Sequence, residues 1–401
     1  VVGLVGSEMC IRDSTCCGAS TVEGIAMQNP TVKRVVIAGG GTAGWTVASL
    51  LAQQLGPLLD ITLVESDEIG TVGVGEATIP TFRSFHALLG VDERAFMRAT
   101  QASFKLGISF ENWGQLGDRY IHPFGEYGVP MGQLPFYHFW SRMRSSGDTN
   151  PLHKYSLNIE AAYANKFIRP VEDQSSLASR ISYAYHFDAT LFGAFLRRYS
   201  ERLGAQRIEA KVVDASLNSE TGHISSVELD DGRSIEGDFF IDCTGFRGLL
   251  IEKALGVPFT DWSDFLPMDS AIAVQTEAIE PPKPYTVATA REAGWTWRIP
   301  LQNRVGNGHV YSSNFTDESS ATDLLLENLD AEPITEPRLL KFQAGRRESF
   351  WKANCLALGL SSGFLEPLES TSIHLIQDGL VRFIALMPDK SLNPANATEY
   401  N

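Results

Sequence analysis

The sequence predicts an α/β fold that is organised around a βαβ unit near its N-terminus. An apolar, β-branched run at 35–38 leads into a glycine-rich turn at 39–44. A helical pattern follows at 45–54, and a second apolar run at 61–64 ends at the acidic Glu65. Strand, turn, helix, strand and terminal acid in this order are typical of parallel α/β proteins.

The glycine turn has the spacing G-x-G-x-x-G, which indicates a dinucleotide site. Gly39 would allow the tight turn, Gly41 would let the backbone approach a pyrophosphate, and Gly44 would let the helix lie close to the strand. The phosphate would rest on the helix N-terminus, and Glu65, about 20 residues on, would hold the ribose hydroxyls. The alternative is a turn in an ordinary βαβ unit. The cofactor-binding residues predicted here are Gly39, Gly41, Thr42, Ala43, Gly44 and Glu65.

Composition and charge narrow the class of protein. The chain has 401 residues, of which 43% are hydrophobic, and this suits one large or two modest globular domains. A formal net charge of -15 argues against a nucleic-acid partner and suits small-molecule ligands. No apolar run approaches the roughly 20 residues that a membrane span needs, so no membrane partner is expected. Cys243 and Cys355 have no metal-ligand spacing and lie in apolar runs, which predicts buried thiols, no metal site and a cytoplasmic location.

The first residues do not fit the rest of the chain. Val1 to Ser14 have no periodicity that continues into the domain, and they resemble translated adapter sequence joined upstream of a gene fragment. We therefore expect residues 1–26 to be a non-native or disordered extension, with Met27 as the natural start.

The middle of the chain alternates between clear and unclear patterns. Asp92 is a plausible N-cap for a helix that carries Phe96, Met97 and Phe104 and delivers Lys105 into an apolar setting. Residues 111–180 have poor periodicity and predict a loop-rich cap or substrate region.

Regular elements return after residue 184. A helix is expected from Asp188 through about Leu203, and strands are expected at 208–217 and 223–229. Asp231-Gly232 predicts a hairpin between 227–229 and 234–236. Residues 239–245 then indicate a returning buried strand that ends in a Thr-Gly turn at Gly245, and 356–372 predict a strand, a glycine-bearing loop and a further helix to about residue 386.

A Rossmann unit, a distant hairpin and a returning strand that ends Thr-Gly resemble the layout of the large FAD-dependent monooxygenase-like group. That resemblance implies an FAD-binding Rossmann-like domain that is discontinuous in sequence, with an inserted mixed substrate region. We expect a single functional unit over 27–401. Its FAD-binding pieces would be about 32–80, 181–254 and 346–390, and its substrate-side pieces about 81–180 and 255–345.

The motifs together closely resemble the flavin-dependent tryptophan halogenases and their broader indole-halogenase relatives. The W-x-W-x-I-P stretch at 295–300 is the most specific, because it separates these halogenases from ordinary flavin hydroxylases. The other matching pieces are 39–45, 72–80, 103–108, 186–189, 242–250 and 359–371. The family continues for about a quarter more chain, mostly helical, so a C-terminal helical part is expected to be missing after Asn401.

The resemblance implies an enzyme that uses FADH2, oxygen and chloride or bromide to make hypohalous acid, which is relayed to Lys105 for electrophilic halogenation of an indole- or tryptophan-like substrate. Glu369 would be the partner carboxylate, and a separate NADH-dependent flavin reductase would supply the FADH2; a homodimer is one assembly to test. By position in the family motifs, Gly245 and Ser370 would contact FAD, Thr371 and Ser372 would hold halide, His122 and Phe124 would line the substrate pocket, and Trp295 and Trp297 would separate flavin from substrate.

The residue types suit this chemistry. A lysine in an apolar wall has a lowered pKa, which favours a neutral amine that can hold an electrophilic halogen in one place. A nearby carboxylate can accept the ring proton. Taken alone, Lys105 would be a solvated lysine on a helix and Glu369 an acid at a helix N-terminus. The alternative functions are a flavin-dependent aromatic hydroxylase and an inactive FAD-binding fragment.

Overall fold

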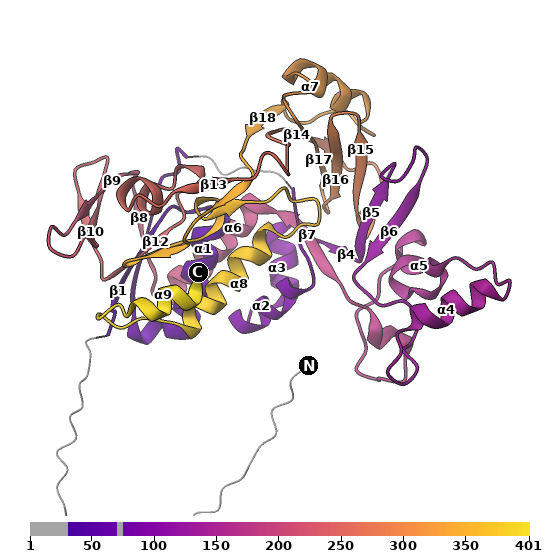
Figure 1. The fold of residues 1–401 in the computed structure, drawn as a ribbon, viewed down its shortest axis with the longest axis horizontal. Helices are drawn as coiled ribbons and strands as arrows, with labels where there is room; N and C mark the ends of the chain where they lie inside the picture. The colour runs from indigo at the N-terminus through magenta and orange to yellow at the C-terminus, as the bar shows by residue number, and fades with distance from the viewer. Residues whose placement is uncertain (1–30, 70–74) are drawn as a thin grey trace, which may run out of the picture.

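The computed structural model of the chain describes residues 31–69 and 75–401. Two large sheets lie side by side, and a small three-stranded sheet lies between them (Figure 1). Helices cover the first large sheet, while the second carries a helix at its far end (Figure 1). This arrangement leaves the small sheet as the junction between the two halves of the molecule.

The first large sheet has six strands in the order β20-β21-β12-β1-β2-β8. It is parallel apart from the edge strand β20, and its centre is β1 (Arg34–Ala38), which pairs with both β12 and β2. Val35 and Ile37 face one hydrophobic cluster and Val36 and Ala38 another, so β1 is buried on both faces, as its continuous apolar run predicts. The other strands are β2 (Asp60–Glu65), β8 (Gln206–Glu209), β12 (Phe239–Asp242), β20 (Trp351–Lys352) and β21 (Cys355–Ala357).

The second large sheet has seven strands in the order β18-β14-β17-β16-β15-β5-β6. It is antiparallel except where β15 runs parallel to β5, and the helix α7 (Glu318–Glu327) packs against β14 and β17. Its strands are β5 (Gly107–Glu111), β6 (Arg119–Pro123), β14 (Ser270–Glu277), β15 (Thr286–Arg291), β16 (Gly294–Pro300), β17 (Arg304–Tyr311) and β18 (Arg338–Lys341).

The junction sheet has the order β3-β7-β4 and is antiparallel. Its strands are β3 (Gly75–Ala77), β7 (Ala184–Asp188) and β4 (Ser103–Lys105). The helix α6 (Ala189–Arg202) follows β7 directly and packs along α1 (Gly41–Leu55), the helix after the glycine turn. The junction sheet therefore connects the strand that carries Lys105 to the glycine-turn half of the molecule.

Smaller elements complete the fold. The expected hairpin is confirmed: β10 (Ile224–Leu229) pairs with β11 (Ser234–Glu236) across Asp231-Gly232. The remaining α-helices and strands of the described residues are α2 (Thr81–Leu89), α3 (Glu93–Thr100), α4 (Phe136–Ser145), α5 (Leu157–Tyr163), α8 (Ser372–Ala385), α9 (Pro394–Tyr400), β9 (Val212–Leu217), β13 (Phe259–Asp261), β19 (Gly345–Arg347) and β22 (Gly363–Phe364).

Three sequence expectations about local structure need correction. Asp92 does cap α3, since its side chain accepts a hydrogen bond of 2.8 Å from the N–H of Ala95. The helix ends at Thr100, however, because Gln101 adopts a left-handed conformation with φ of 55°. The expectation that this helix carries Phe104 is therefore wrong. Phe104 and Lys105 lie on β4, where they pair with β7.

The other two corrections concern a strand and a loop region. The strand expected at 208–217 is two strands, because the N–H of Ala210 bonds the carbonyl of Glu65 and the chain then leaves the large sheet. The region 111–180 contains β6, α4 and α5, so the expectation that it is loop-rich is wrong for those segments. No residue of α4 is fully buried, although Phe136, Phe139, Trp140 and Met143 have helical spacing and are partly buried.

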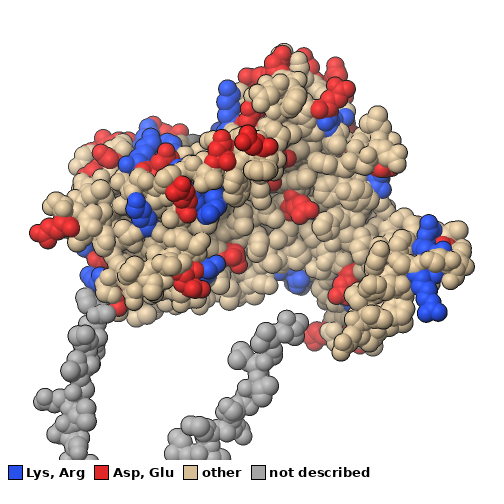
Figure 2. Space-filling view, in the orientation of Figure 1, with Lys and Arg blue, Asp and Glu red and all other residues tan. Residues whose placement is uncertain are grey.

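The surface agrees with the negative net charge of the sequence, which is -15. On the face shown in Figure 2, lysines and arginines lie singly among acidic residues, and acidic side chains gather over α7. Within the described ranges no helix is long and apolar enough to cross a membrane.

Candidate active site

The glycine turn after β1 is very tight. Gly39 has a left-handed φ of +101°, and a Cβ there would lie 2.3 Å from the carbonyl oxygen of Cys243. A Cβ on Gly44 would lie 2.0 Å from the carbonyl oxygen of Gly39. Gly41 is also left-handed, with φ of +68°. Side chains at these positions would push α1 away from β1, so the sequence needs glycine to bring the helix N-terminus to the strand end.

The N-terminus of α1 has no side-chain cap. Its N-cap residue is Gly40, and Thr42 and Ala43 lie half-buried in the first turn. The N–H groups of this turn are therefore available to an anion, which the helix dipole also favours. A Cβ on Gly359, from the segment after β21, would lie only 2.8 Å from the Cβ of Ala43, so this second segment packs against the same turn.

Glu65 lies at the end of β2 and is held in place by two neighbours. Its Oε2 accepts a hydrogen bond of 3.1 Å from the indole nitrogen of Trp45, and its Oε1 accepts one of 2.7 Å from Nε of Arg207. A Cβ on Gly40 would fall 1.7 Å from Oε2. The carboxylate therefore lies directly against the glycine turn. Neither Trp45 nor Arg207 was predicted as a partner of Glu65. Arg207 lies on β8, 142 residues further along the chain, so its contact with Glu65 depends on the pairing of β2 with β8.

The returning strand β12 ends beside the glycine turn. The buried carboxylate of Asp242 accepts backbone hydrogen bonds from Thr244, Leu250 and Ile251 at 2.8–2.9 Å, which fixes the turn that follows. Gly245 has φ of +71°, and a Cβ there would meet nothing within 4 Å. The glycine-rich backbone at 39–43, at 243–245 and at Gly359 thus lies close together. These residues fit an extended dinucleotide such as FAD.

Lys105 is fully buried at the end of β4. Its Nζ donates a hydrogen bond of 2.9 Å to Oγ of Ser370 and lies 5.2 Å from the centre of the Phe124 ring. Burial lowers the pKa of Lys105 to about 7, and the negative charge of Glu369 acts in the opposite direction. Ser370 has a left-handed φ of +63°, an uncommon conformation for a residue other than glycine.

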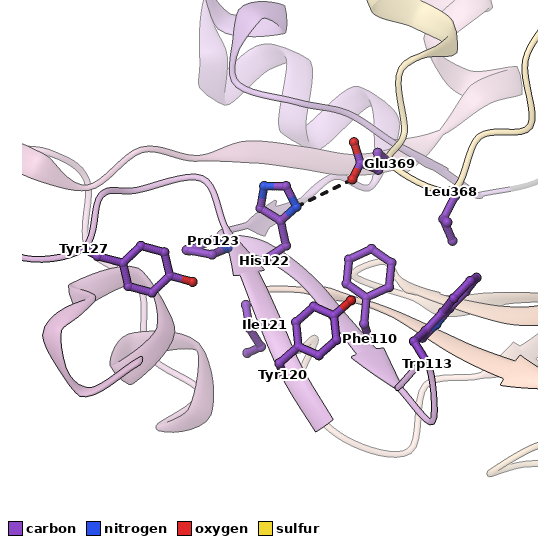
Figure 3. Close-up of a pocket in the computed structure, with 9 residues that line it drawn as sticks. All are labelled: Phe110, Trp113, Tyr120, Ile121, His122, Pro123, Tyr127, Leu368 and Glu369. Carbon is purple, nitrogen blue, oxygen red and sulfur yellow. Dashed lines mark ion pairs between the residues drawn. The ribbon is translucent and has the colours of Figure 1, made fainter. Parts of the chain in front are cut away.

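A pocket of about 380 Å³ opens beside Glu369 (Figure 3). His122 points toward Glu369, with Nδ1 3.6 Å from Oε1, and both side chains are more than half exposed, which makes this a weak ion pair. Lys105 does not line the pocket; Glu369 and Ser370, which are adjacent in sequence, connect the two. The lining residues are Phe110, Trp113, Tyr120, Ile121, His122, Pro123, Tyr127, Leu368 and Glu369.

The aromatic lining is the part of the site that sequence reasoning missed. Of the two residues predicted to face the substrate, His122 lines the pocket, whereas Phe124 does not and lies beside Lys105 instead. Phe110, Trp113 and Tyr120 line the pocket and were not predicted. The sequence signal for this lining was the high density of aromatic residues between 110 and 127. It could not be placed in a pocket, because the pairing of β5 with β6, which brings these side chains together, was not predicted.

Thr371 and Ser372 lie at the start of α8. Thr371 occupies the N-cap position, and no side chain caps this helix. The first-turn N–H groups are therefore available to a small anion such as halide. They directly follow Ser370, which binds Lys105.

Trp295 and Trp297 lie on β16 with their ring centres 6.1 Å apart. Trp295 is buried, and its indole N–H donates to the carboxylate of Glu366. Trp297 is partly buried and lies over Gly308, where a Cβ would fall 2.1 Å from its ring. Burial raises the pKa of Glu366, although the bond from Trp295 opposes that shift. The two indoles thus form one contiguous aromatic surface.

Comparison with known proteins agrees with this geometry. The family model for tryptophan halogenase matches residues 34–401. The chain is 39% identical over 389 residues to a tryptophan 7-halogenase from Lentzea aerocolonigenes, across 92% of this chain and 73% of that protein.

Solved structures give the same result. A flavin-dependent halogenase from Xanthomonas campestris is 51% identical, with a TM-score of 0.89 over 92% of this chain and 74% of that one. One from Brevundimonas sp. BAL3 is 47% identical, with a TM-score of 0.89 over 93% and 75%. These matches confirm the predicted resemblance, the FAD-binding α/β fold and the use of reduced flavin and halide. The chain therefore belongs to the tryptophan halogenase family and is a flavin-dependent halogenase.

Proposed function

We propose that this halogenase modifies a small, electron-rich aromatic substrate of the indole or tryptophan type, with Lys105 as the residue that carries the halogen. One observation carries the proposal: Lys105 is completely buried, and its amine is held by Ser370, whose neighbour in sequence, Glu369, lines an aromatic pocket. A buried lysine without a full countercharge is costly to the fold, and such groups cluster at functional sites.

The FAD would be held by the glycine turn at 39–44, by Glu65, by Gly245 and by Ser370. When bound in its reduced form with oxygen and halide, it supplies hypohalous acid. Thr371 and Ser372 would hold the halide at the N-terminus of α8, next to the residue that binds Lys105. This adjacency supports a path for the oxidant through the protein interior from the α8 loop to the lysine.

Lys105 has two ways to hold the halogen. As a neutral amine it takes the halogen from hypohalous acid, forming an N–halogen bond and releasing water. Alternatively, its ammonium donates a hydrogen bond to the acid. The pKa of about 7 supports the amine, because a large share of the lysine is then neutral at physiological pH. In both cases the electrophile is fixed in one place, which is a proximity effect.

The pocket supplies the acceptor. The aromatic side chains around Glu369 suit a flat ring, and a volume of about 380 Å³ suits a ligand of indole size. Transfer of the halogen from Lys105 to a ring carbon breaks a C–H bond, and the carboxylate of Glu369 accepts that proton and stabilises the positive charge on the ring. The nitrogen that has lost its halogen then takes a proton, which the protonated Glu369 returns, so that the amine of Lys105 and the carboxylate of Glu369 are both regenerated. His122 and Phe124 would orient the ring, and Trp295 and Trp297 would keep it away from the flavin.

The sequence boundaries and the cellular setting are part of the same proposal. We assign 32–80, 181–254 and 346–390 to the flavin side and 81–180 and 255–345 to the substrate side. A separate NADH-dependent reductase would supply FADH2. The buried free thiols of Cys243 and Cys355 support a cytoplasmic location.

The test is a product analysis of the whole chain. The protein is incubated with FAD, a flavin reductase, NADH, and chloride or bromide over a panel of indole, tryptophan and substituted indoles, and products are read by mass spectrometry. Halogen isotope patterns on at least one indole-type substrate are expected. Hydroxylated product without any halogenated product would show a hydroxylase instead, and flavin turnover without either product would leave only an FAD-binding protein.

A further inference from the structure

A chain of buried polar side chains lies directly beside Lys105. His186 on β7 is completely buried; its Nδ1 lies 3.1 Å from Oγ of Ser103 on β4, and its Nε2 lies 3.0 Å from Oγ1 of Thr286 on β15. Ser103 also donates a hydrogen bond of 2.5 Å to the carbonyl oxygen of Pro300. Ser103 and Thr286 are each only 5% exposed. Direct hydrogen bonds therefore link residues of four strands, β16, β4, β7 and β15.

Counting donors fixes the protonation of this chain. A carbonyl oxygen can only accept, so the single hydroxyl proton of Ser103 is used on Pro300. Ser103 must then accept from His186, which places a proton on Nδ1. In the neutral ring Nε2 is an acceptor, and the hydroxyl of Thr286 donates to it. Burial and the positive charge of Lys105 both hold the pKa of His186 well below its usual range.

The geometry relates this chain to the lysine. Ser103 and Lys105 are two residues apart on β4, so their side chains leave the same face of the strand. Both pair with β7, Ser103 opposite His186 and Lys105 opposite Ala184. Pro300 ends β16, the strand that carries Trp295 and Trp297. The hydrogen bond from Ser103 to Pro300 thus connects β4, which carries Lys105, to β16, which carries Trp295 and Trp297.

The other titratable groups that act on Lys105 are few. Glu369, from the loop before α8, attracts its charge, and Ser370 accepts its hydrogen bond. His186, on the neighbouring strand β7, is the further titratable group whose pKa the charge of Lys105 affects. A charged imidazole there would place a second cation beside the amine, whereas a neutral one does not. A neutral histidine therefore provides a rigid link without further destabilising the protonated lysine.

We propose that His186 is the positioning residue of Lys105. Its neutral, Nδ1-protonated imidazole fixes Ser103, and Ser103 fixes the register of β4 against Pro300, so that the lysine amine stays in contact with Ser370. The proposal rests on the proposed role of Lys105 as the halogen carrier. A histidine that only fills the core would affect stability and leave the efficiency of halogen transfer unchanged.

The first experiment measures halogenated product per FADH2 oxidised in the full chain. In H186A the amine loses its fixed position, and the ratio should fall by about tenfold to 100-fold while FADH2 oxidation continues, because small misplacements of a reacting group cost this much. In H186N the amide N–H2 replaces the Nδ1 donor to Ser103, and the ratio should recover to within about threefold of the unmodified enzyme. In H186Q the amide reaches the Nε2 position instead, and recovery should fail. Equal ratios in H186N and H186Q would overturn the proposal, even if H186A does not fold.

The matched control is another buried histidine. His309 on β17 is 1% exposed, and its Nδ1 bonds the carbonyl oxygen of Ala321 on α7. H309A should lower the melting temperature by an amount similar to H186A and leave the product ratio unchanged. A drop in the ratio for H309A as large as that for H186A would mean that general loosening of the fold is the cause, which would overturn the positioning role.

The second experiment is spectroscopic and needs no activity. Imidazole ¹⁵N shifts of the unmodified enzyme should show a neutral Nδ1–H tautomer at His186 that does not titrate between about pH 6 and 9. An Nε2–H tautomer, or titration near the usual pKa, would contradict the proposal. The variant Lys105→Met distinguishes failure of the proposed function from failure of the proposed role of His186. If K105M still halogenates, the proposed function fails; if K105M is inactive and H186A has an unchanged ratio, only the role of His186 fails.

Discussion

The flavin side on the six-stranded sheet and the lysine site on the junction sheet hold their functional groups in different ways. On the six-stranded sheet, Gly39, Glu65 and Gly245 lie at the same ends of the neighbouring parallel strands β1, β2 and β12, each within a few residues of its strand. At the lysine site, the bond between Lys105 on β4 and Ser370 in the loop before α8 joins residues 265 positions apart. Each flavin-side residue is thus positioned first by the end of its own strand, and long-range contacts such as that between Glu65 and Arg207 then hold it in place. The lysine site, in contrast, has no local element that brings Lys105 and Ser370 together, and it forms only when distant parts of the chain meet.

This difference predicts where substitutions act. On the flavin side, a single added methyl group should disrupt the fold of the turn, because backbone atoms cannot move out of its way. On the lysine side, the backbone should tolerate substitution, and the loss should appear in chemistry.

The largest effect on cofactor binding is expected on the flavin side. Gly44→Ala places a Cβ 2.0 Å from the carbonyl oxygen of Gly39, so α1 must move off β1. Such overpacking costs about 1–3 kcal/mol or more, and the displaced helix N-terminus should weaken FAD affinity at least about 100-fold. Titration of FAD followed by flavin fluorescence measures this effect.

Gly193→Ala is the control for that substitution. Gly193 lies on α6 near the same turn, but its Cβ would meet the carbonyl carbon of Gly41 at an ordinary 3.8 Å. G193A should bind FAD normally and be slightly more stable, since alanine favours a helix by up to about 1 kcal/mol. Equal loss of FAD affinity in both variants would mean that the tight turn is not the cause.

The next effect concerns the carboxylate at the pocket. Glu369→Gln keeps the shape of the side chain and removes its negative charge, so halogenation should fall by about 100-fold, the typical contribution of a general base. FAD binding and FADH2 oxidation should stay within about twofold of the unmodified enzyme. Comparing single-turnover rates of product formation and flavin oxidation gives both numbers. An equal loss in the rates of product formation and flavin oxidation would mean that Glu369 acts on the flavin reaction and not on transfer of the halogen.

The pH dependence should be smaller and specific to the lysine side. Because burial lowers the pKa of Lys105 to about 7, halogenation through the neutral amine should fall about tenfold per pH unit below that value. The pKa of Glu76 is raised by burial to about 7, so the same profile must be measured in Glu76→Gln. The acidic limb should persist in E76Q. If the fall in halogenation at low pH disappears in E76Q, the group that titrates is Glu76 and not Lys105.

The same pKa has a consequence for stability. The pKa of Lys105 in the folded chain lies below its usual 10.5, so between about pH 7 and 10.5 the unfolded chain binds a proton that the folded chain does not. The contribution of this group to the free energy of unfolding therefore increases as the pH rises through this range. Lys105→Met should remove that increase in urea melts.

The smallest effect is expected at the tryptophan pair. Trp295→Phe removes the indole N–H that bonds Glu366 and leaves the carboxylate without that partner, which costs about 1–3 kcal/mol of stability. The aromatic surface remains, so halogenated product should stay above hydroxylated product. Thermal melts and product ratios measure the two consequences. Hydroxylation that exceeds halogenation in W295F would show that the proposed separation of substrate and flavin depends on the bond to Glu366 and not on the aromatic surface.

The sequence predicts the flavin side well because its signals are local. The glycine spacing, the terminal Glu65 and the Asp231-Gly232 turn each depend on a few neighbouring residues, and α1, β1, β2 and the hairpin lie where these signals indicate. The end of α3 was mispredicted, because the left-handed conformation of Gln101 leaves no mark in the sequence.

The lysine site was predictable only through the family resemblance. Spacing alone gives no reason to place Lys105 next to Ser370 or Glu369, and the burial of the lysine depends on β4 pairing with β7. The partners of His186 were missed for the same reason, since Ser103 and Thr286 lie 83 and 100 residues away from it.

The most direct test of the whole account is Lys105→Met in the full chain. Methionine retains much of the length and apolar stem of lysine and cannot hold an electrophilic halogen as an amine does. Halogenated product per FADH2 oxidised should fall by at least about 1,000-fold, while FAD affinity, FADH2 oxidation and release of free hypohalous acid, trapped with a chlorination or bromination indicator, continue. Halogenation by K105M at a rate near that of the unmodified enzyme would contradict the account.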